Sequence, residues 1–240
     1  MKRAWLTISV ILLLFSTPLF AWYYFTTAGG LRQQWVFGTS CNTSGSRPIT
    51  MIYDADLPGT FQAAIAPVIV QWNTPTGGNL LCPVGTCAPT NPTYQRTMDA
   101  TAVSNFVSSP TSNQIWLVWD SDGSVLRSVG IDPTSGVLGI GVGLDANSSR
   151  PQDLCAGVLL LNGTSISTTT RFQQVSIHEI GHVLGLAHSI AGNNMGTVTA
   201  QSAGCSGVAC LPVMFPFLFS NSSTTLNPDD LAGARSIYAP

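Results

Sequence analysis

Charged side chains are scarce in this sequence of 240 residues: they make up 8% of it, whereas an average soluble domain has roughly 25%. Lys2 is the only lysine, Glu179 is the only glutamate, and there are three histidines. The formal net charge is -2, so the chain lacks the basic excess that nucleic-acid binding requires, and no nucleic-acid partner is expected. Apolar residues nevertheless make up 45%, which is enough for a substantial hydrophobic core.

The N-terminus is predicted to be an export signal. Lys2 and Arg3 precede an apolar stretch at 8–15, and small residues follow at two candidate cleavage sites, Ala21 and Ala28. A short positive region, an apolar core and a small residue before the cleavage point are the parts of a secretory signal peptide. The chain is therefore expected to be secreted, to the extracellular space or to the periplasm.

A retained membrane anchor is the alternative for the same segment. The largely apolar residues 5–25 reach the roughly 20 residues that a helix needs to cross a bilayer. Contact with a membrane is expected only in that case. Under either interpretation the chain divides into a signal peptide or N-terminal anchor at 1–28, a short N-terminal segment at 29–47 and one folded domain at 48–240.

Six cysteines in an exported chain indicate disulfides rather than free thiols. Four of them form two pairs that are close in sequence, within stretches rich in Gly, Pro, Ser or Thr. Local pairing is preferred, although six cysteines allow 15 connectivities. The candidate disulfides are Cys82–Cys87, Cys205–Cys210 and, from the remaining two, Cys41–Cys155.

Apolar periodicity and turn residues predict the order of strands and helices. Strands are expected at 48–58, at 113–130 as a hairpin turning at Asp122-Gly123, at 136–145 and at 156–163, and helices at 57–72, at 170–185 with Thr170 as N-cap, and from Asn227. The glycines of the strand at 136–145 indicate close approach by another backbone. The run at 120–123 has some features of a calcium loop but lacks the remaining ligands, so calcium is possible but not supported by the sequence.

The stretch HEIGHVLGLAH contains every histidine of the chain and its only glutamate. His178 and His182 are one helical turn apart and differ by only about 40° in direction, so both imidazoles can reach one ion. Gly185 lets the chain turn away from the helix, so that His188 can return as a third ligand. Three neutral histidines leave the fourth corner of a zinc tetrahedron for water, and Glu179 is placed to take a proton from it.

This stretch resembles the zinc-binding signature of the metzincin endopeptidases, and the chain looks most like their matrixin-like branch. The signature matches from His178 to Ser189, and the resemblance extends over roughly 48–240. It implies an α/β, zincin-like fold with a twisted mixed, mostly parallel sheet, an active-site helix and a small irregular C-terminal subdomain. It also implies a methionine turn below the metal, for which Met214 is preferred over Met195.

By the same resemblance, the expected function is that of a zinc-dependent endopeptidase (EC 3.4.24-type) with one catalytic zinc ion. The expected partner is an extended peptide or protein substrate that lies along the strand near 137–143, with an apolar pocket near 214–219, and the protein is expected to be a monomer. Two alternatives remain open: a surface-anchored binding module that holds zinc without cleaving, and a zinc hydrolase with a non-peptide substrate. The intact Glu179 argues against the first.

Cys41 has two possible roles under this resemblance. As a thiolate it could take the fourth zinc position and hold the enzyme latent, as a pro-segment cysteine does in matrixins. The surrounding GTSCNTSGSRP lacks the matrixin switch pattern. A disulfide with Cys155, favoured by an oxidising compartment and an even number of cysteines, is therefore the preferred expectation.

Overall fold

The structure is a computed structural model, and it describes residues 26–28, 30–35, 49–75, 80–82, 95–111, 113–145, 152–189, 211–215 and 218–238. Several expectations fall outside these residues, namely most of 1–28, the side chain of Cys82, Cys41, Cys87, Met195, Cys205 and Cys210. Cys155 is buried and disulfide-bonded, and its pairing with Cys41 stays a prediction. Within the described parts of the chain, every helix is too short or too polar to cross a membrane.

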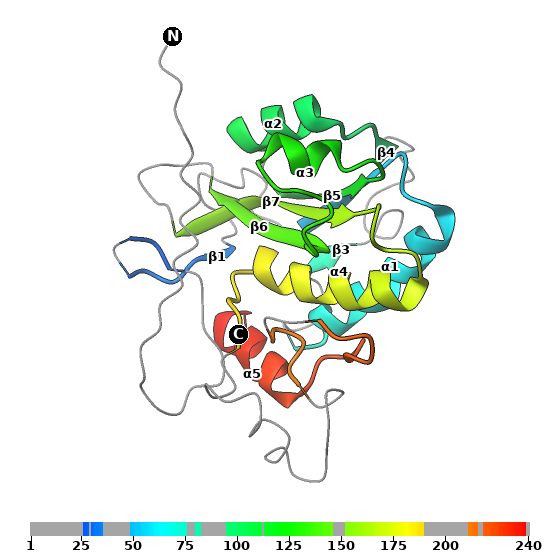
Figure 1. Ribbon diagram of the computed structural model, residues 1–240. Coiled ribbons are helices and arrows are strands. Elements are labelled where there is room, and N and C mark those ends of the chain that lie inside the picture. Colours follow the sequence, from blue (N-terminus) through cyan, green and yellow to red (C-terminus); the bar gives the residue numbers. More distant parts are fainter. Residues whose placement is uncertain are drawn as a thin grey trace.

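One mixed sheet forms the centre of the molecule (Figure 1). Its described strands are β1 (Gln34–Trp35), β2 (Ile49–Asp54), β3 (Leu81–Cys82), β4 (Gln95–Arg96), β5 (Gln114–Asp120), β6 (Gly139–Asp145) and β7 (Asp153–Asn162). The order is β1-β7-β5-β2-β3, with β4 also paired to β2 and β6 also paired to β7. Only the β6–β7 pairing is antiparallel among those described. The predicted α/β fold with a mostly parallel sheet is confirmed.

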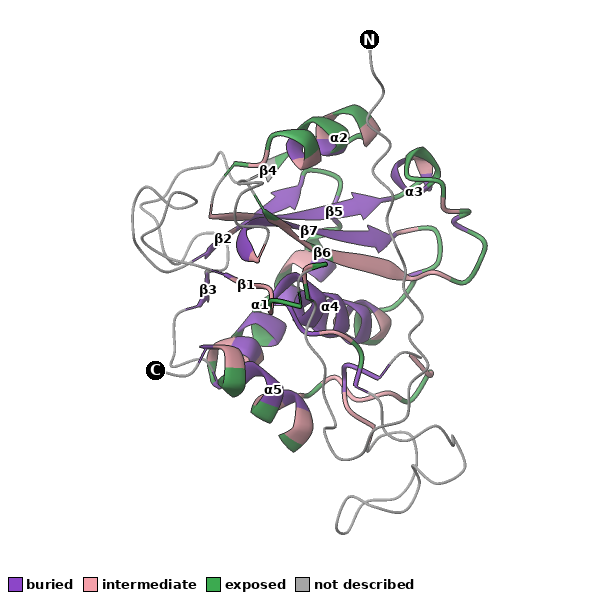
Figure 2. Ribbon diagram, turned by 90° about the vertical axis from the view of Figure 1, so that its left-hand side faces the viewer, coloured by how far each residue is buried: buried purple, intermediate pink, exposed green. Residues whose placement is uncertain are grey.

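Helices cover both faces of the sheet (Figure 1). The described helices are α1 (Gly59–Asn73), α2 (Ala100–Ser108), α3 (Ser124–Ser128), α4 (Thr169–Val183) and α5 (Pro228–Tyr238). α1 and α4 lie on one face and α2 and α3 on the other, while α5 lies beyond α4 (Figure 1). Because both faces are covered, β5 and β7 are buried along almost their whole length (Figure 2), as expected for central parallel strands.

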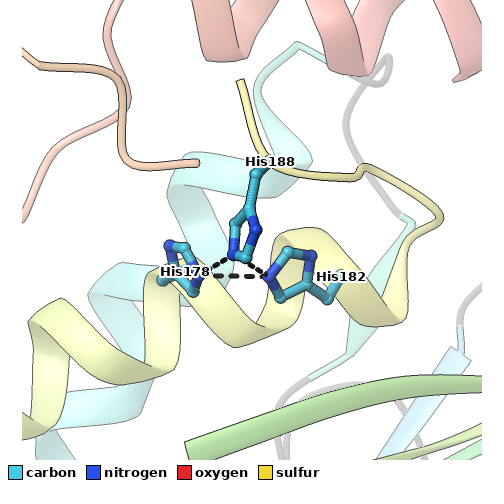
Figure 3. A group of neighbouring side chains, drawn as sticks. All are labelled: His178, His182 and His188. Atoms are coloured by element: carbon cyan, nitrogen blue, oxygen red, sulfur yellow. Dashed lines mark hydrogen bonds between the residues drawn. The ribbon is translucent and has the colours of Figure 1, made fainter. Parts of the chain in front are cut away.

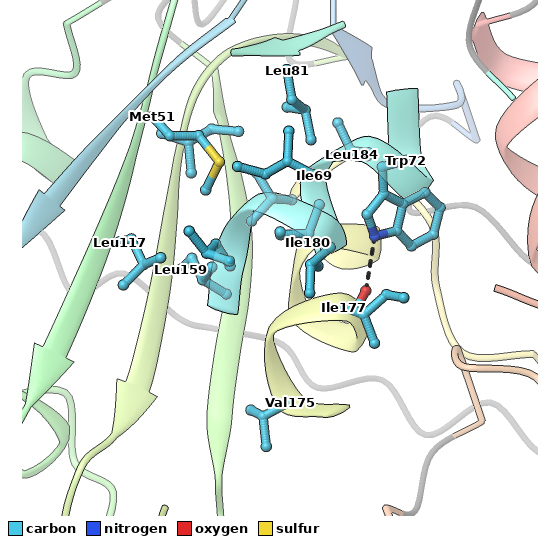
Figure 4. Packing of buried hydrophobic residues seen from close by; sticks show 14 of the residues in the cluster. Met51, Ile69, Trp72, Leu81, Leu117, Leu159, Val175, Ile177, Ile180 and Leu184 are labelled. Atoms are coloured by element: carbon cyan, nitrogen blue, oxygen red, sulfur yellow. Dashed lines mark hydrogen bonds between the residues drawn. The ribbon is translucent and has the colours of Figure 1, made fainter. Parts of the chain in front are cut away.

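The helix predicted around 57–72 is confirmed as α1, and it runs through Pro67. Proline has no N–H group, so the carbonyl of Ala63, four residues earlier, loses its partner within the helix. Both residues are on the exposed face, so water can solvate that carbonyl. The opposite face is apolar and packs into the core between the sheet and α4 (Figure 4). There the indole of Trp72 donates a hydrogen bond of 3.0 Å to the carbonyl of Ile177, which ties α1 to α4.

Three alternate glycines let β6 lie directly on α4. A Cβ atom on Gly139 would come within 2.9 Å of Glu179 Cγ, and one on Gly143 would come within 3.0 Å of the Val183 carbonyl oxygen. A Cβ atom on Gly141 would collide with the backbone carbonyl of Glu179. The close backbone approach predicted for this strand is therefore confirmed, and the approaching backbone is that of α4.

The hairpin predicted at 113–130 is wrong. β5 lies between two parallel neighbours, β2 and β7, and helix α3 follows it instead of a returning strand. The carboxylate of Asp120 accepts hydrogen bonds from the backbone N–H groups of Val125 (3.1 Å) and Leu126 (2.9 Å), which satisfies free donors at the start of the helix. Gly123, with φ of +75°, supplies the left-handed residue that precedes it.

Two acidic residues lie side by side at the start of α5. Asn227, where this helix was predicted to begin, caps it, since its Oδ1 accepts from the N–H groups of Asp229 (2.9 Å) and Asp230 (3.2 Å). Oδ2 of Asp229 is buried and has no hydrogen-bond partner among the described residues. Burial, with a smaller contribution from the charge of Asp230, raises the pKa of Asp229 to about 6. Folding therefore makes this carboxyl group harder to ionise.

We expect Asp229→Asn to raise the free energy of unfolding at neutral pH by about 1–2 kcal/mol, after allowance for partial exposure. Because the pKa of Asp229 is raised, this carboxyl group stabilises the fold at pH values below its ordinary pKa of 3.8. That stabilisation is lost as the pH rises through about 6. The variant has no charge to bury, so its advantage should grow from about pH 4 to about pH 8. Chemical denaturation across that range measures the difference.

Asp132→Asn is a control of opposite sign. Hydrogen bonds from Thr134 to the exposed Asp132 lower the pKa of that carboxyl group. The carboxylate therefore stabilises the fold at pH values above its ordinary pKa, and this effect is lost in acid. The control variant should therefore be less stable than the wild type at neutral pH and approach it in acid. An effect of Asp229→Asn that does not change with pH would contradict the proposed ionisation.

Candidate active site

Helix α4 is the scaffold of the candidate site, and it is buried on nearly all sides from Phe172 to Val183. Its N-cap lies two residues before the predicted one. Thr168 is the N-cap, with its side chain accepting a hydrogen bond of 3.2 Å from the N–H of Arg171. Thr168 keeps an extended backbone, as an N-cap residue does, whereas the predicted cap, Thr170, already lies inside the helix.

Gly185 ends α4 as predicted. Its φ of +94° is in the left-handed region that favours glycine. The N–H of Gly185 donates to the His182 carbonyl, and the N–H of Leu186 donates to the Gly181 carbonyl, both at 2.9 Å. This pair of bonds is a Schellman motif. A side chain at position 185 would also come within 2.6 Å of the Gln33 carbonyl oxygen, so glycine is required here on two counts.

Two aromatic residues that are far apart in the sequence hold the end of α4. The indole of Trp35 in β1 donates to the Val183 carbonyl at 2.9 Å, and the hydroxyl of Tyr238 in α5 donates to the Leu184 carbonyl. These carbonyls have no partner within the helix. Their side-chain partners fix the turn that leads to His188. Sequence patterns gave no signal for either contact, because both depend on the tertiary fold.

The three histidines of the chain converge (Figure 3). The Nε2 atom of His182 lies 3.1 Å from that of His178 and 3.1 Å from that of His188, and the third Nε2–Nε2 distance is 3.3 Å. Tetrahedral ligands on zinc–nitrogen bonds of about 2.0–2.1 Å lie about 3.3 Å apart. The donor set therefore fits one zinc ion. Among the described residues, no other group of three His, Cys, Asp or Glu side chains comes close enough to share an ion.

Backbone carbonyls orient two of the imidazoles. Nδ1 of His178 lies 2.6 Å from the Val213 carbonyl oxygen, and Nδ1 of His182 lies 2.7 Å from that of Leu186. A carbonyl can only accept, so each Nδ1 carries the hydrogen and each Nε2 presents its lone pair to the common centre. Burial lowers the pKa of His178 to about 4 and holds the pKa of His182 well below its ordinary value. Both rings are therefore neutral, as metal binding requires.

Glu179 lies between α4 and β6 and is only 7% exposed. Burial raises the pKa of its carboxyl group to about 8, and a hydrogen bond from the backbone of Gly141 offsets part of this effect. A carboxyl group with a pKa close to neutral can both accept and return a proton. The glycines of β6 therefore do more than allow packing, because they bring a backbone donor to the one glutamate of the chain.

Met214 packs beneath the triad. It is buried, and a Cβ atom on Gly181, between the first two histidines, would collide with its Sδ atom. The carbonyl of Met214 accepts a hydrogen bond of 2.8 Å from the N–H of Ser189, the residue after His188. Met214 thus lies against α4 between the first two histidines, and the sequence resemblance expects a methionine turn below the metal. The competing Met195 lies outside the described residues, so the assignment of the turn to Met214 stays a prediction.

Part of the chain is similar to a known protein family. Residues 92–203 match the family model of the matrixins, peptidase family M10. This segment includes β5, β6, β7 and α4 together with the whole histidine triad. No curated protein sequence matches the chain. The similarity of this segment to the matrixins, the α/β fold and the converging histidines together support a matrixin-like zinc metalloprotease.

Proposed function

We propose that this protein is an endopeptidase that hydrolyses peptide bonds within extracellular proteins or peptides. The convergence of three Nε2 atoms beside the only glutamate of the chain, next to β6, which pairs on one side only among the described strands, carries the proposal. The extracellular location rests on the export signal predicted at 1–28, and action as a monomer rests on the resemblance to matrixins.

In this proposal each residue of the site has a separate task. His178, His182 and His188 would hold zinc through Nε2, and the bonds from Nδ1 to backbone carbonyls keep the first two rings in position. When bound, zinc polarises the substrate carbonyl and lowers the pKa of water toward neutrality. Glu179 takes a proton from the attacking water and passes it to the leaving amine. Its burial keeps competing water away from the carboxyl group.

The substrate is proposed to bind as an added strand along β6. Among the described strands, β6 pairs only with β7, so its other edge offers backbone N–H and C=O groups to an extended peptide. Because Gly141 of β6 lies against Glu179 and His182 of α4, a peptide on that edge would pass close to these two residues. Binding through the backbone would select for an extended conformation more than for particular side chains.

Selectivity is proposed to come from the segment near 214–219. Phe215 and Phe219 face each other with ring centroids 6.5 Å apart, which supports an apolar preference for the side chain after the scissile bond. The guanidinium of Arg171 donates to the carbonyls of Leu218 (3.1 Å) and Phe219 (2.9 Å). The first turn of α4 thereby holds the end of this segment, which favours a defined pocket over an adaptable one.

A peptide-library digest tests the proposed function. We expect cleavage inside peptide chains, loss of cleavage when a chelator removes the metal, and recovery when zinc is added back. The same preparation should bind zinc. Tight zinc binding without cleavage of any peptide would contradict an endopeptidase and favour a binding module. Hydrolysis confined to non-peptide esters or amides would favour a different zinc hydrolase.

A further inference from the structure

The dipeptide Val213-Met214 contacts one histidine of the triad and the residue that follows another. The Val213 carbonyl accepts from Nδ1 of His178 at 2.6 Å, and the Met214 carbonyl accepts from the N–H of Ser189 at 2.8 Å. Ser189 directly follows His188. The position of this one dipeptide therefore affects two of the three histidines, although it belongs to a segment that lies beyond them in the sequence.

A buried carboxylate holds the other side of the dipeptide. Oδ2 of Asp230 accepts from the N–H of Val213 at 2.9 Å, and Oδ1 accepts from the N–H of Met214 at 3.1 Å. Oδ2 also accepts from the N–H of Asn227 at 3.0 Å, and Asp230 is only 2% exposed. All three partners are donors, so the position requires a group that only accepts, and hydrogen bonds to a carboxylate are stronger than those between neutral groups.

We propose that Asp230 is a positioning residue for the metal site: acting through Val213 and Met214, it orients the His178 imidazole and locates the chain at His188. The inference rests on the proposed zinc site and assigns to it a side chain that touches neither the metal nor the substrate. The dipeptide is held between two constraints. Met214 packs against Gly181 of α4 on one side, and the carboxylate of Asp230 binds the backbone on the other.

Asp230 also supports the start of α5, and this structural role can be separated from the proposed one. Asn227 caps the helix through its own side chain, which accepts from the N–H groups of Asp229 and Asp230. Asn227→Ala removes that cap and leaves the carboxylate of Asp230 on Val213 and Met214. Asp230→Asn keeps the cap and weakens the contacts with Val213 and Met214, because an amide has one acceptor oxygen and its NH2 group would face backbone donors.

The experiment compares the zinc affinity of the wild type, Asp230→Asn and Asn227→Ala, by competition with a chromophoric chelator, under conditions in which circular dichroism shows each metal-free protein to be folded. We expect Asp230→Asn to bind zinc about tenfold more weakly, the lower end of the range for residues that orient metal ligands. Asn227→Ala should stay within about twofold of the wild type, even though its α5 is destabilised. Equal affinity in the two variants would overturn the inference.

Two further variants keep the test decisive. Asp230→Glu retains the charge but displaces the carboxylate by one methylene group, so this variant should bind zinc less tightly than Asn227→Ala. If Asp230→Asn does not fold without metal, the comparison of Asp230→Glu with Asn227→Ala takes its place. His188→Ala tests the zinc site itself. Wild-type affinity in both Asp230 variants, with zinc lost from His188→Ala, would overturn the positioning role while leaving the zinc site intact. Since binding is measured, absence of peptidase activity would not affect the result.

Discussion

Replacement of Glu179 by Gln is expected to lower kcat/KM by about 10²–10⁴-fold, the contribution typical of a general acid or base. Gln keeps the shape of the side chain but cannot take a proton. The three histidines are unchanged, so about one zinc ion per chain should remain bound, as in other sites with three protein ligands. Hydrolysis of a peptide found in the library digest, together with metal analysis of the same samples, measures both quantities.

His188→Ala is the matched control because it removes a proposed ligand and leaves the proposed base. This variant should lose both activity and tight zinc binding, whereas Glu179→Gln should lose activity alone. Wild-type turnover in Glu179→Gln would rule out the proposed base. Stoichiometric, tightly bound zinc in His188→Ala would show that the third ligand is a different group.

Gly141→Ala is expected to reduce activity by about 100-fold, because a shift of about 1 Å in a catalytic group can cost that much. The added methyl group would collide with the backbone carbonyl of Glu179 and lie 3.0 Å from the Cβ atom of His182. These atoms belong to a buried helix and cannot move separately, so β6 and α4 must separate. We also expect the free energy of unfolding to fall by about 1–3 kcal/mol, as for other overpacked positions.

Gly59→Ala is the control for this substitution. Gly59 begins α1, has no atom within 4 Å of an added Cβ, and does not need a positive φ. Alanine there should leave activity unchanged and the protein as stable as the wild type or slightly more so. Activity and melting temperature of the two variants, measured side by side, separate a collision at β6 from a general effect of replacing glycine. Full activity of Gly141→Ala would mean that the spacing between β6 and α4 is not critical.

The sequence was informative where the structure depends on the spacing of residues that are close together in the chain. The spacing of His178 and His182 along a helix, and the glycine before His188, predicted a convergence that the fold contains. The Gly-rich strand predicted a close backbone neighbour and did not identify it. That neighbour is α4, whose contacting residues lie more than thirty positions further along the sequence, and no pattern within a strand can specify so distant a partner.

Local signals failed where a distant partner decided the structure. Asp122-Gly123 is a strong hairpin signal. In the structure β5 instead pairs with two parallel strands, and Asp120 caps the helix that follows it. The acidic pair at the start of α5 is typical of a helix N-terminus. Nothing in that pattern indicated that the carboxylate of Asp230 would bind Val213 and Met214, because the two segments meet only in the folded chain.

The contacts of Asp230 and Tyr238 also determine when, during synthesis, the triad can take its final form. A growing chain that has been translated as far as His188 contains all three histidines, but it has neither the carboxylate that holds Val213 and Met214 nor the hydroxyl that binds the Leu184 carbonyl. At about 5–20 residues per second, the ribosome needs about 2–10 s more to add them. A nascent chain released in that interval carries the complete zinc motif without the contacts that give it its geometry.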